Sequence, residues 1–313
     1  MEPTLERSGI ASEAKRHDAL RDAIKARRPD LPLPDDDDTD LLASGLLDIP
    51  LLLQAQRDFA AWAGLPNPDI RDSLGARSIR TMATLVAKQR QSGTARPVIV
   101  RPANVETSDP GVVASVVAFV LAAGGPYFTE FFGGRDRAAG LVHEWVLRDS
   151  SELHLSRWSL LLIDGQVAGG HLCLRGDILA RCRATDAFVA LREDMADDSE
   201  RLTAFLAATK SLFAPVPRTS YYLSKTALMP EFRGQGLGDY LFRDCLAVAI
   251  EAEGPALQLD VHRDNRPAIA VYRRYGFRTI HTGHLPDSEV AYLSMSATLQ
   301  PGTRPPNGPG ERS

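Results

Sequence analysis

The sequence predicts an α/β (α+β) domain in which strands alternate with helices, preceded by a small all-α helical bundle. Up to about residue 90, apolar side chains recur at helical spacing with almost no β-branched alternation. From Pro97 onward, apolar strands alternate with helical segments, which is the pattern of a sheet domain. The 313 residues, 44% of them hydrophobic, also exceed the roughly 100–200 residues of one typical domain.

The composition limits the partners and the compartment. A net charge of −4 provides no basic field that would attract nucleic acid or an anionic membrane. The longest apolar run, residues 112–123, is shorter than the roughly 20 residues that span a bilayer, and the N-terminus has no signal-peptide core. The three cysteines are odd in number and lack metal-ligand spacing. We therefore expect a cytoplasmic protein with no metal site, no nucleic-acid partner and no membrane partner.

The helical bundle is expected over residues 8–92. Helices are predicted at 11–26, 51–62 and 79–88. Pro29 ends the first helix, and the acidic run at 35–38 is interpreted as a solvated loop. A domain boundary follows near residues 91–93.

The sheet domain is expected over residues 95–298. Asp109 and Pro110 are typical of a helix start, as N-cap and first-turn proline. Asp164-Gly165 is typical of a tight antiparallel hairpin. The expected elements are strand 98–101, helices 112–121 and 138–147, strands 158–163 and 166–174, and helix 198–213. Residues 299–313 are rich in Pro and Gly and are predicted to be a disordered tail.

A strand from residue 221 leads into a glycine-rich turn that opens a helix reaching residue 252. Free N–H groups and the positive end of a helix favour an anion at such a turn. Gly234, Gly236 and Gly238 allow close backbone approach, and Arg233 adds positive charge. The turn lacks the Gly-Lys-Ser/Thr ending of a P-loop and the spacing of a dinucleotide fingerprint. The pattern predicts a phosphate site of another kind, or a plain connecting turn.

Downstream, apolar and polar residues alternate along strand 256–262, which places Gln258, Asp260 and His262 on one face. Asp264 and Asn265 then cap a helix that carries Pro267 in its first turn and ends at Gly276.

Two motifs resemble those of the GNAT acetyltransferase superfamily. The run from Arg233 to Gly238 is similar to the family's pyrophosphate motif. Asn265, Ala268, Tyr272 and Gly276-Phe277 are similar to its later signature. The motifs occur in the family's order, separated by one helix and one strand. The resemblance covers residues 157–280, with only the order of elements matching over 97–156. It implies a mixed twisted sheet flanked by helices.

The resemblance also implies a cofactor and a reaction. Acetyl-CoA, or another acyl-CoA, would be the co-substrate, and an amine would attack the thioester directly. The implied cofactor-binding residues are Ala227, Leu228 and Met229 for the pantetheine arm, Arg233, Gly234, Gln235, Gly236, Leu237 and Gly238 for the pyrophosphate, and Asn265 for the arm. The N–H of Leu228 would polarise the thioester oxygen.

The resemblance implies that Tyr272 is the catalytic acid that protonates the leaving thiolate, although a tyrosine in this apolar pattern is also typical of packing. Many relatives carry a carboxylate on the strand before the turn, whereas this chain has Ser224, Lys225 and Thr226. His262 is our first alternative as the catalytic base, because an imidazole ring is suited to proton transfer near neutral pH. A structural or solvent-facing His262 and a base relayed by water stay open.

The helical bundle resembles an acyl carrier protein in the order of its helices and in the run Gly45-Leu46-Leu47-Asp48. Ile49 and Pro50 follow where carriers have the phosphopantetheine serine. The bundle is therefore either a pseudo-carrier that docks a carrier protein or other protein, or a plain helical extension.

These inferences predict an acyl-CoA-dependent N-acetyltransferase that acts on a primary amine of a small molecule. We expect the first helices and residues 178–217 to determine the substrate. One alternative is a specialised-metabolism acyltransferase that uses a carrier-protein-bound acyl donor or acceptor. The other is a non-catalytic scaffold that binds CoA or docks a protein.

Overall fold

The computed structural model describes residues 13–63, 68–88, 98–100, 109–286 and 288–300. The chain divides into two compact units, Met1–Ala95 with Arg274–Gly276, and Arg96–Arg273 with Phe277–Ser313. The predicted boundary at 91–93 and the tail from residue 301 lie outside the described residues. Leu299, which we predicted as the first tail residue, is buried, and its N–H donates to the Pro255 carbonyl at 2.9 Å. Leu299 is therefore part of the sheet domain.

The first unit is an all-α bundle, as predicted. Its helices are α1 (Glu13–Arg27), α2 (Ile49–Trp62), α3 (Ile70–Gly75) and α4 (Ile79–Lys88). Leu20, Ile24 and Phe59 are fully buried in it. Asp48 caps α2 by accepting a hydrogen bond from the Leu51 N–H at 2.9 Å, and Pro50 lies in the first turn. The residues that resemble a carrier loop thus also have a local helix-starting role.

The acidic run at 35–38 is not simply solvated. Asp37 accepts hydrogen bonds from Arg21 at 2.7 Å and, at its other oxygen, lies 2.6 Å from the His17 ring. These partners lower the pKa of Asp37 although burial opposes the effect. The interpretation as a free loop was wrong for this residue, because two bases on α1 bind it.

The second unit contains a seven-stranded sheet in the order β1-β2-β3-β4-β5-β7-β6. The strands are β1 (Val98–Val100), β2 (Trp158–Ile163), β3 (Gln166–Arg175), β4 (Tyr221–Leu228), β5 (Ala256–His262), β6 (Arg278–His284) and β7 (Ala291–Thr298). Among the described strands, β4 and β5 pair in parallel, and the other neighbouring strands pair antiparallel. The mixed sheet flanked by helices confirms the predicted fold class.

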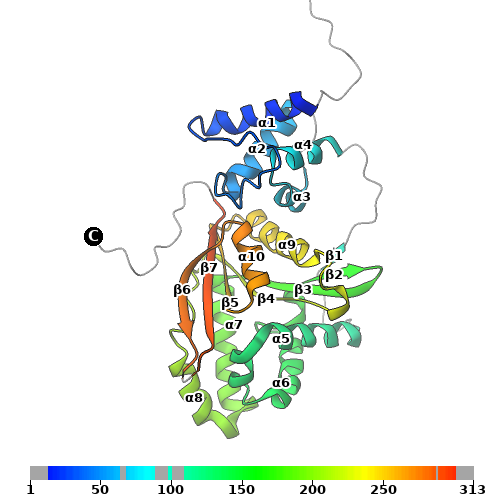
Figure 1. Ribbon diagram of the computed structural model, residues 1–313. Coiled ribbons are helices and arrows are strands. Elements are labelled where there is room, and N and C mark those ends of the chain that lie inside the picture. The colour runs from blue at the N-terminus through cyan, green and yellow to red at the C-terminus, as the bar shows by residue number, and fades with distance from the viewer. Residues whose placement is uncertain (1–12, 64–67, 89–97, 101–108, 287, 301–313) are drawn as a thin grey trace, which may run out of the picture. The chain divides into compact units, whose positions relative to one another are not determined.

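Helices cover both faces of this sheet (Figure 1). They are α5 (Pro110–Phe131), α6 (Arg135–Leu147), α7 (Gly176–Val189), α8 (Ser199–Ala208), α9 (Leu237–Glu251) and α10 (Arg266–Arg274). Helices α5 and α6 lie on one face and α9 on the other.

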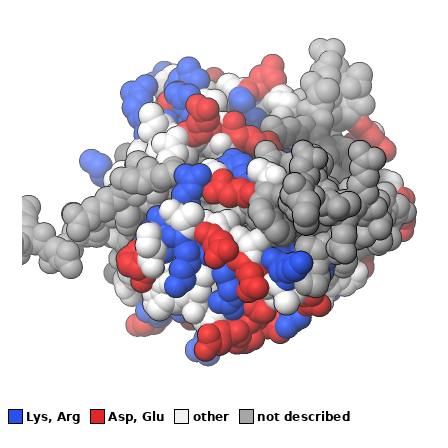
Figure 2. Space-filling view, turned by 90° about the horizontal axis from the view of Figure 1, so that it is seen from above, with Lys and Arg blue, Asp and Glu red and all other residues white. Residues whose placement is uncertain are grey.

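On the face shown in Figure 2, acidic and basic side chains of the described residues are interspersed.

Two predicted helices differ from those observed. Helix α5 runs beyond residue 121 to Phe131, because the chain turns at Gly125, with φ 57°, and resumes helical geometry at Pro126. Helix α8 ends at Ala208 rather than 213, and Leu212 packs beyond it with Leu285 and Tyr292. Helix α7 was not predicted, because its buried face mixes Leu179 and Cys182 with the polar Asp186.

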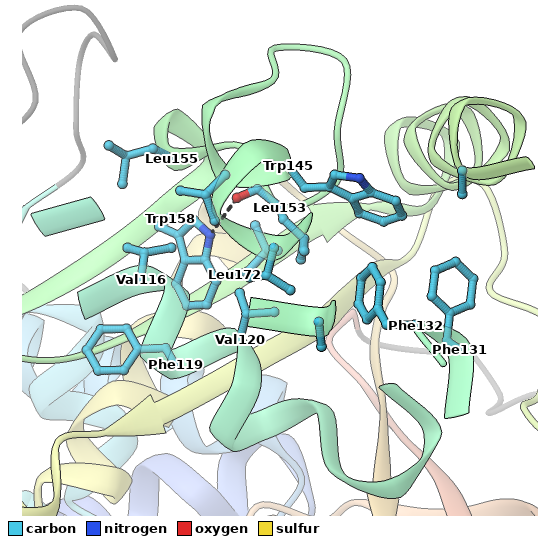
Figure 3. Packing of buried hydrophobic residues seen from close by; sticks show 14 of the residues in the cluster. Val116, Phe119, Val120, Phe131, Phe132, Trp145, Leu153, Leu155, Trp158 and Leu172 are labelled. Carbon is cyan, nitrogen blue, oxygen red and sulfur yellow. Dashed lines mark hydrogen bonds between the residues drawn. The ribbon is translucent and has the colours of Figure 1, made fainter. Parts of the chain in front are cut away.

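The main core lies between the sheet and helices α5 and α6 (Figure 3). The Phe119 and Trp158 ring centres are 6.1 Å apart, and the Trp158 indole N–H donates to the Leu153 carbonyl at 3.1 Å. By length and composition α5 is the one described helix that could cross a membrane. Its Val116 and Phe119 are buried in this core, which gives its apolar length a role in packing.

Candidate active site

The parallel strands β4 and β5 separate after a short paired region. Their ladder joins Tyr221–Leu223 to Leu257–Leu259. The ladder between β3 and β4 shifts register, so that Leu172 faces Lys225 and Cys173 faces Leu223. Ser224 is therefore the extra residue of a β-bulge, and bulges bend strands and redirect side chains. The separation and the bulge occur at the same place on β4.

The glycine-rich turn has the geometry of an anion site. Gly234 and Gly236 adopt φ values of 76° and 78°, which favour glycine. A Cβ added at either position would meet no atom within 4 Å, so positive φ rather than crowding explains these glycines. Gly236 begins α9, which has no side-chain cap hydrogen bond. The first N–H groups of α9 are thus suited to a pyrophosphate.

A groove of about 340 Å³ lies between β4, α9 and α10. It is lined by Thr226, Ala227, Leu228, Arg233, Gly238, Leu241, Phe242, Asn265, Pro267, Ala268, Val271 and Tyr272. The structure thus brings together six of the residues that we predicted for the site, from both motifs. We refer to this hollow as the donor groove, because it contains residues that the family resemblance implies for acyl-CoA binding.

The backbone of β4 presents one amide to the donor groove. The Met229 N–H donates to the Ala168 carbonyl of β3 at 2.9 Å, and the Met229 carbonyl accepts from the Phe232 N–H at 3.0 Å. Both backbone groups of Met229 are therefore engaged within the protein. Successive N–H groups of a strand point in opposite directions. The Leu228 N–H consequently points away from β3, toward the separation from β5.

The other predicted turn residues lie around the groove. The Arg233 side chain donates to the Leu228 carbonyl at 3.2 Å, and the Gln235 side chain donates to the Glu231 carbonyl at 3.0 Å. Leu237 packs with Leu241 and holds the start of α9 against the sheet. Asn265 accepts a hydrogen bond from the Ala268 N–H at 3.3 Å, as the predicted cap.

Tyr272 lies at the buried end of the donor groove. Its ring centre is 4.9 Å from that of Phe242 and 6.2 Å from that of Phe277. Burial, reinforced by the nearby Cys245 thiol, raises the pKa of Tyr272 above its usual range. The hydroxyl therefore stays protonated, as a proton donor requires.

A second hollow, of about 250 Å³, adjoins the same strand. We refer to it as the acceptor pocket. Ser224 and Lys225 line this pocket, whereas the next three residues of β4 line the donor groove. Its aromatic lining consists of Tyr127, Phe128, Phe131, Trp145, Phe213, Tyr222 and Tyr292. Its charged lining consists of Glu152, Arg183, Asp186, Lys225 and Asp260.

Glu152 reaches the acceptor pocket from the loop after α6. Its carboxylate accepts a hydrogen bond from the Arg183 Nε at 2.8 Å and another from the Ser224 hydroxyl. Burial alone would raise the pKa of Glu152, but the charges of Arg183 and Lys225 more than offset this and lower it. Glu152 is therefore ionised and held in place. Its loop is fixed by the Trp158 bond to Leu153 (Figure 3).

Asp260 enters the pocket from β5. Its two oxygens accept hydrogen bonds from the Tyr222 hydroxyl, at 2.7 Å, and from the Ser294 hydroxyl. Burial raises the pKa of Asp260 in spite of these bonds. A carboxylate with a raised pKa binds a proton more readily than an exposed one.

Lys225 is the third charged group near the bulge. Its side-chain nitrogen donates to the carbonyl and hydroxyl oxygens of Ser224, both at 3.2 Å. The same nitrogen lies 4.4 Å from the centre of the Phe128 ring. Burial lowers the pKa of Lys225 to about 8.

The sequence analysis missed these carboxylates as members of a site. The polar face of β5 already marked Asp260 as unusual, so a signal for it existed. Glu152 lies 72 positions before Ser224 in a loop, and no local pattern marks it. The absence of a carboxylate at 224–226 is thus compensated in space by side chains from other elements.

His262 lies at the end of β5. Its Nδ1 accepts a hydrogen bond from the Asp264 N–H at 3.1 Å, and its ring centre is 5.5 Å from that of Tyr292. This bond leaves Nε2 as the ring nitrogen for a further partner. The role of His262 as a base stays a prediction.

The chain resembles known proteins over this region. A candidate ribosomal protein bS18-alanine N-acetyltransferase of Bacillus subtilis (strain 168) is 36% identical over 79 residues, which are 25% of this chain and 52% of that protein. The chain thus spans about half the length of this curated relative.

Solved structures of acetyltransferases also match. An N-acetyltransferase from Staphylococcus aureus Mu50 is 14% identical, with a TM-score of 0.47, over 64% of this chain and 100% of that chain. The ribosomal-protein-S18-alanine N-acetyltransferase from Escherichia coli is 13% identical, with a TM-score of 0.38, over 65% of this chain and 94% of that chain.

The family comparison covers both motifs. Residues 128–277 match the model of the acetyltransferase (GNAT) family. The match contains β4, the glycine-rich turn, β5 and α10, so it includes every element that lines the donor groove. Over residues 128–277, the sheet domain therefore matches the GNAT acetyltransferase family.

Proposed function

We propose that the protein is an acyl-CoA-dependent N-acyltransferase that transfers an acetyl group directly to a primary amine of a small molecule. The observation that supports it best is the arrangement along β4. Thr226–Leu228 line the donor groove, and Ser224 and Lys225 line the acceptor pocket. A thioester beside Leu228 would thus lie next to an enclosed pocket that contains carboxylates.

The reaction assigns a role to each group. The amine loses a proton to a base, and its nitrogen then attacks the thioester carbonyl carbon, forming a C–N bond as the C–S bond breaks. The Leu228 N–H would stabilise the negative charge on the carbonyl oxygen. Tyr272 would donate its proton to the leaving thiolate and recover one from water.

Asp260 is our choice for the base. The raised pKa of Asp260 makes it the stronger proton acceptor, whereas the lowered pKa of Glu152 makes that carboxylate a weak one. Glu152 also forms an ion pair with Arg183 at 2.8 Å. We therefore assign Glu152 to holding Arg183 and the bulge, and Asp260 to the proton transfer.

The size of the pocket favours a small acceptor. The volume of about 250 Å³ lies just below the usual range for ligand pockets, roughly 300–1,000 Å³. The Bacillus subtilis relative, by its name, acts on an alanine of a ribosomal protein, which makes a protein N-terminus the second candidate. Parallel assays with small amines and with an alanine-ended peptide distinguish the two.

The cofactor site is tested by calorimetric titration of acetyl-CoA into the protein and into a Gly236→Glu variant. The added carboxylate would lie where the pyrophosphate binds and would strain a positive φ. We expect binding to weaken at least about 100-fold. Gly140→Glu is the matched control, because Gly140 is exposed on α6 with no atom within 4 Å of an added Cβ. Equal binding by both variants would contradict the proposed site.

The helical bundle resembles an acyl carrier protein. We propose separately that this bundle docks a carrier protein. It is tested with the full chain by comparing acetyl-CoA with an acetyl-loaded carrier protein as donor. Faster transfer from the carrier protein would support docking, and transfer from CoA alone would favour a plain helical extension.

A further inference from the structure

The acceptor pocket contains a buried ammonium group on which the charges of Glu152 and Asp260 act without a direct ion pair among the described residues. Lys225 is 8% exposed. Its nitrogen contacts two oxygens of Ser224 and the face of Phe128, none of which carries a negative charge. Among the described residues, no carboxylate forms an ion pair with it. An ammonium has three donors, so one of them stays available toward the pocket.

Three of the other charged side chains in the pocket have partners within the protein, whereas Oδ1 of Asp186 has no hydrogen-bond partner. Glu152 pairs with Arg183 at 2.8 Å. Asp260 accepts hydroxyl hydrogen bonds at both oxygens. Burying a charge is costly unless it is paired. The geometry thus leaves Lys225 as the group that would gain most from an anion.

The aromatic rings do not form a cage for a cation. The Arg183 guanidinium lies 4.8 Å from the centre of the Tyr222 ring, and the Lys225 nitrogen lies 4.4 Å from that of Phe128. These two ring faces are covered by the protein's own cations. The Tyr127 ring contacts both Phe131 and Phe213, and this aromatic surface suits a hydrocarbon or aromatic side chain.

We propose that the acceptor is an amino acid with an apolar or aromatic side chain, whose carboxylate pairs with Lys225 while its amine faces Asp260. This inference rests on the proposed function. It names the substrate class of the same pocket and makes Lys225 the residue that selects for a carboxylate. The apolar side chain of the substrate would pack against the aromatic lining.

The experiment compares amino acids with the amines that differ from them only by loss of the carboxylate. The pairs are phenylalanine with phenethylamine, tyrosine with tyramine, and leucine with isopentylamine. We expect the protein to acetylate an amino acid in preference to its amine. Lys225→Met should reduce kcat/KM for that amino acid roughly 10- to 100-fold, as for a lost charged hydrogen bond. The variant should reduce kcat/KM for the amino acid at least about tenfold more than kcat/KM for the matching amine.

Two variants serve as controls. Lys225→Arg keeps the positive charge and should keep the preference for the carboxylate. Lys210→Met removes an exposed lysine outside the pocket and should change nothing. If Lys225→Met lowers kcat equally for both members of a pair, the lysine acts in proton transfer and the inference is overturned. A preference for the amines would overturn it as well.

Binding separates this inference from the proposed function. Calorimetric titration of the same amino acids and amines into CoA-loaded protein measures their binding affinity without acetyl transfer. Amino-acid binding that is lost in Lys225→Met supports the carboxylate anchor even if no acetyl transfer occurs, in which case only the proposed function fails. No binding of any of these amino acids would overturn the inference.

Discussion

At the scale of single residues, the site contains two buried carboxyl groups whose pKa values are shifted in opposite directions. Asp260 is shielded from water and bonded to hydroxyl groups, so its pKa rises. Glu152 is buried as well, but it lies beside Arg183 and Lys225, so its pKa falls. Two acidic side chains in one pocket can therefore have different roles, one as proton acceptor and one as fixed charge.

Replacing Asp260 tests this division. Asp260→Asn keeps the shape of the side chain and removes the base, so kcat should fall by about 10²–10⁴, the usual contribution of a general base. Affinity for acetyl-CoA should not change. In the unaltered protein, kcat/KM should fall as the pH decreases through the raised pKa of Asp260, because the protonated carboxyl cannot accept a proton.

Steady-state kinetics over a range of pH, together with calorimetry, measures both effects. Asp164→Asn is the matched control, since Asp164 lies in the β2–β3 hairpin turn with φ 50°, a conformation that Asn tolerates. An Asp260→Asn variant with undiminished kcat would transfer the role to His262 or Glu152.

At the scale of secondary-structure elements, the close approach of β3 and β4 places the Leu228 amide. A Cβ at Gly169 would lie 2.6 Å from a methyl carbon of Leu228 and 2.7 Å from the Ala227 carbonyl oxygen. The methyl group can rotate away, but the carbonyl belongs to the backbone. A side chain here would therefore push β4 away at the residues that line the donor groove.

Gly169→Ala should accordingly lower the free energy of unfolding by about 1–3 kcal/mol, as overpacking does. It should also raise KM for acetyl-CoA and lower kcat, because the Leu228 N–H moves. Denaturant unfolding and kinetics measure these changes. Gly140→Ala, in an exposed helical position with free space, should instead be neutral or slightly stabilising. Wild-type kinetics in Gly169→Ala would show that β4 is not positioned by this contact.

At the scale of the whole molecule, the buried Asp186 carboxyl reduces the free energy of unfolding at neutral pH. Burial raises the pKa of Asp186 to about 6, while its Oδ2 accepts the Glu152 N–H at 2.8 Å. A carboxyl whose pKa is raised on folding contributes stability below its unfolded pKa and loses that contribution as pH rises through the folded value. Asp186 therefore favours the folded state less at pH 7 than at pH 4.

The Asp186→Asn variant has no carboxyl group at this position, so it should not lose stability as the pH rises. The oxygen of the Asn side chain can still accept the hydrogen bond from the Glu152 N–H. The free energy of unfolding of the variant relative to wild type should increase between pH 4 and pH 7, by about 1–3 kcal/mol, and level off above. Urea unfolding at several pH values measures it. Asp136→Asn, at an exposed position on α6, should show no such trend. A constant difference across this range would mean that Asp186 has an ordinary pKa.

The sequence by itself determined the local features of this protein. The Asp109 cap, the Asp164-Gly165 hairpin and the glycine-rich turn before α9 depend on backbone geometry within a few residues. Such features are legible because the same side chains that cause them are adjacent in the chain. The family motifs lie in the same local segments, which is why the donor groove could be predicted.

Only the tertiary structure decided the composition of the acceptor pocket. Glu152 meets Ser224 across 72 positions, and Ser294 meets Asp260 across 34. Helix α7, which supplies Arg183 and Asp186, carried no recognisable pattern because its inner face is partly polar. From sequence alone, a polar residue on a helix or loop is predicted to be solvent-exposed. Its burial, and the resulting shift of its pKa, depend on tertiary packing. Pairing and burial of these charges are properties of the folded chain, and they distinguish a charged pocket from a surface of ordinary charged residues.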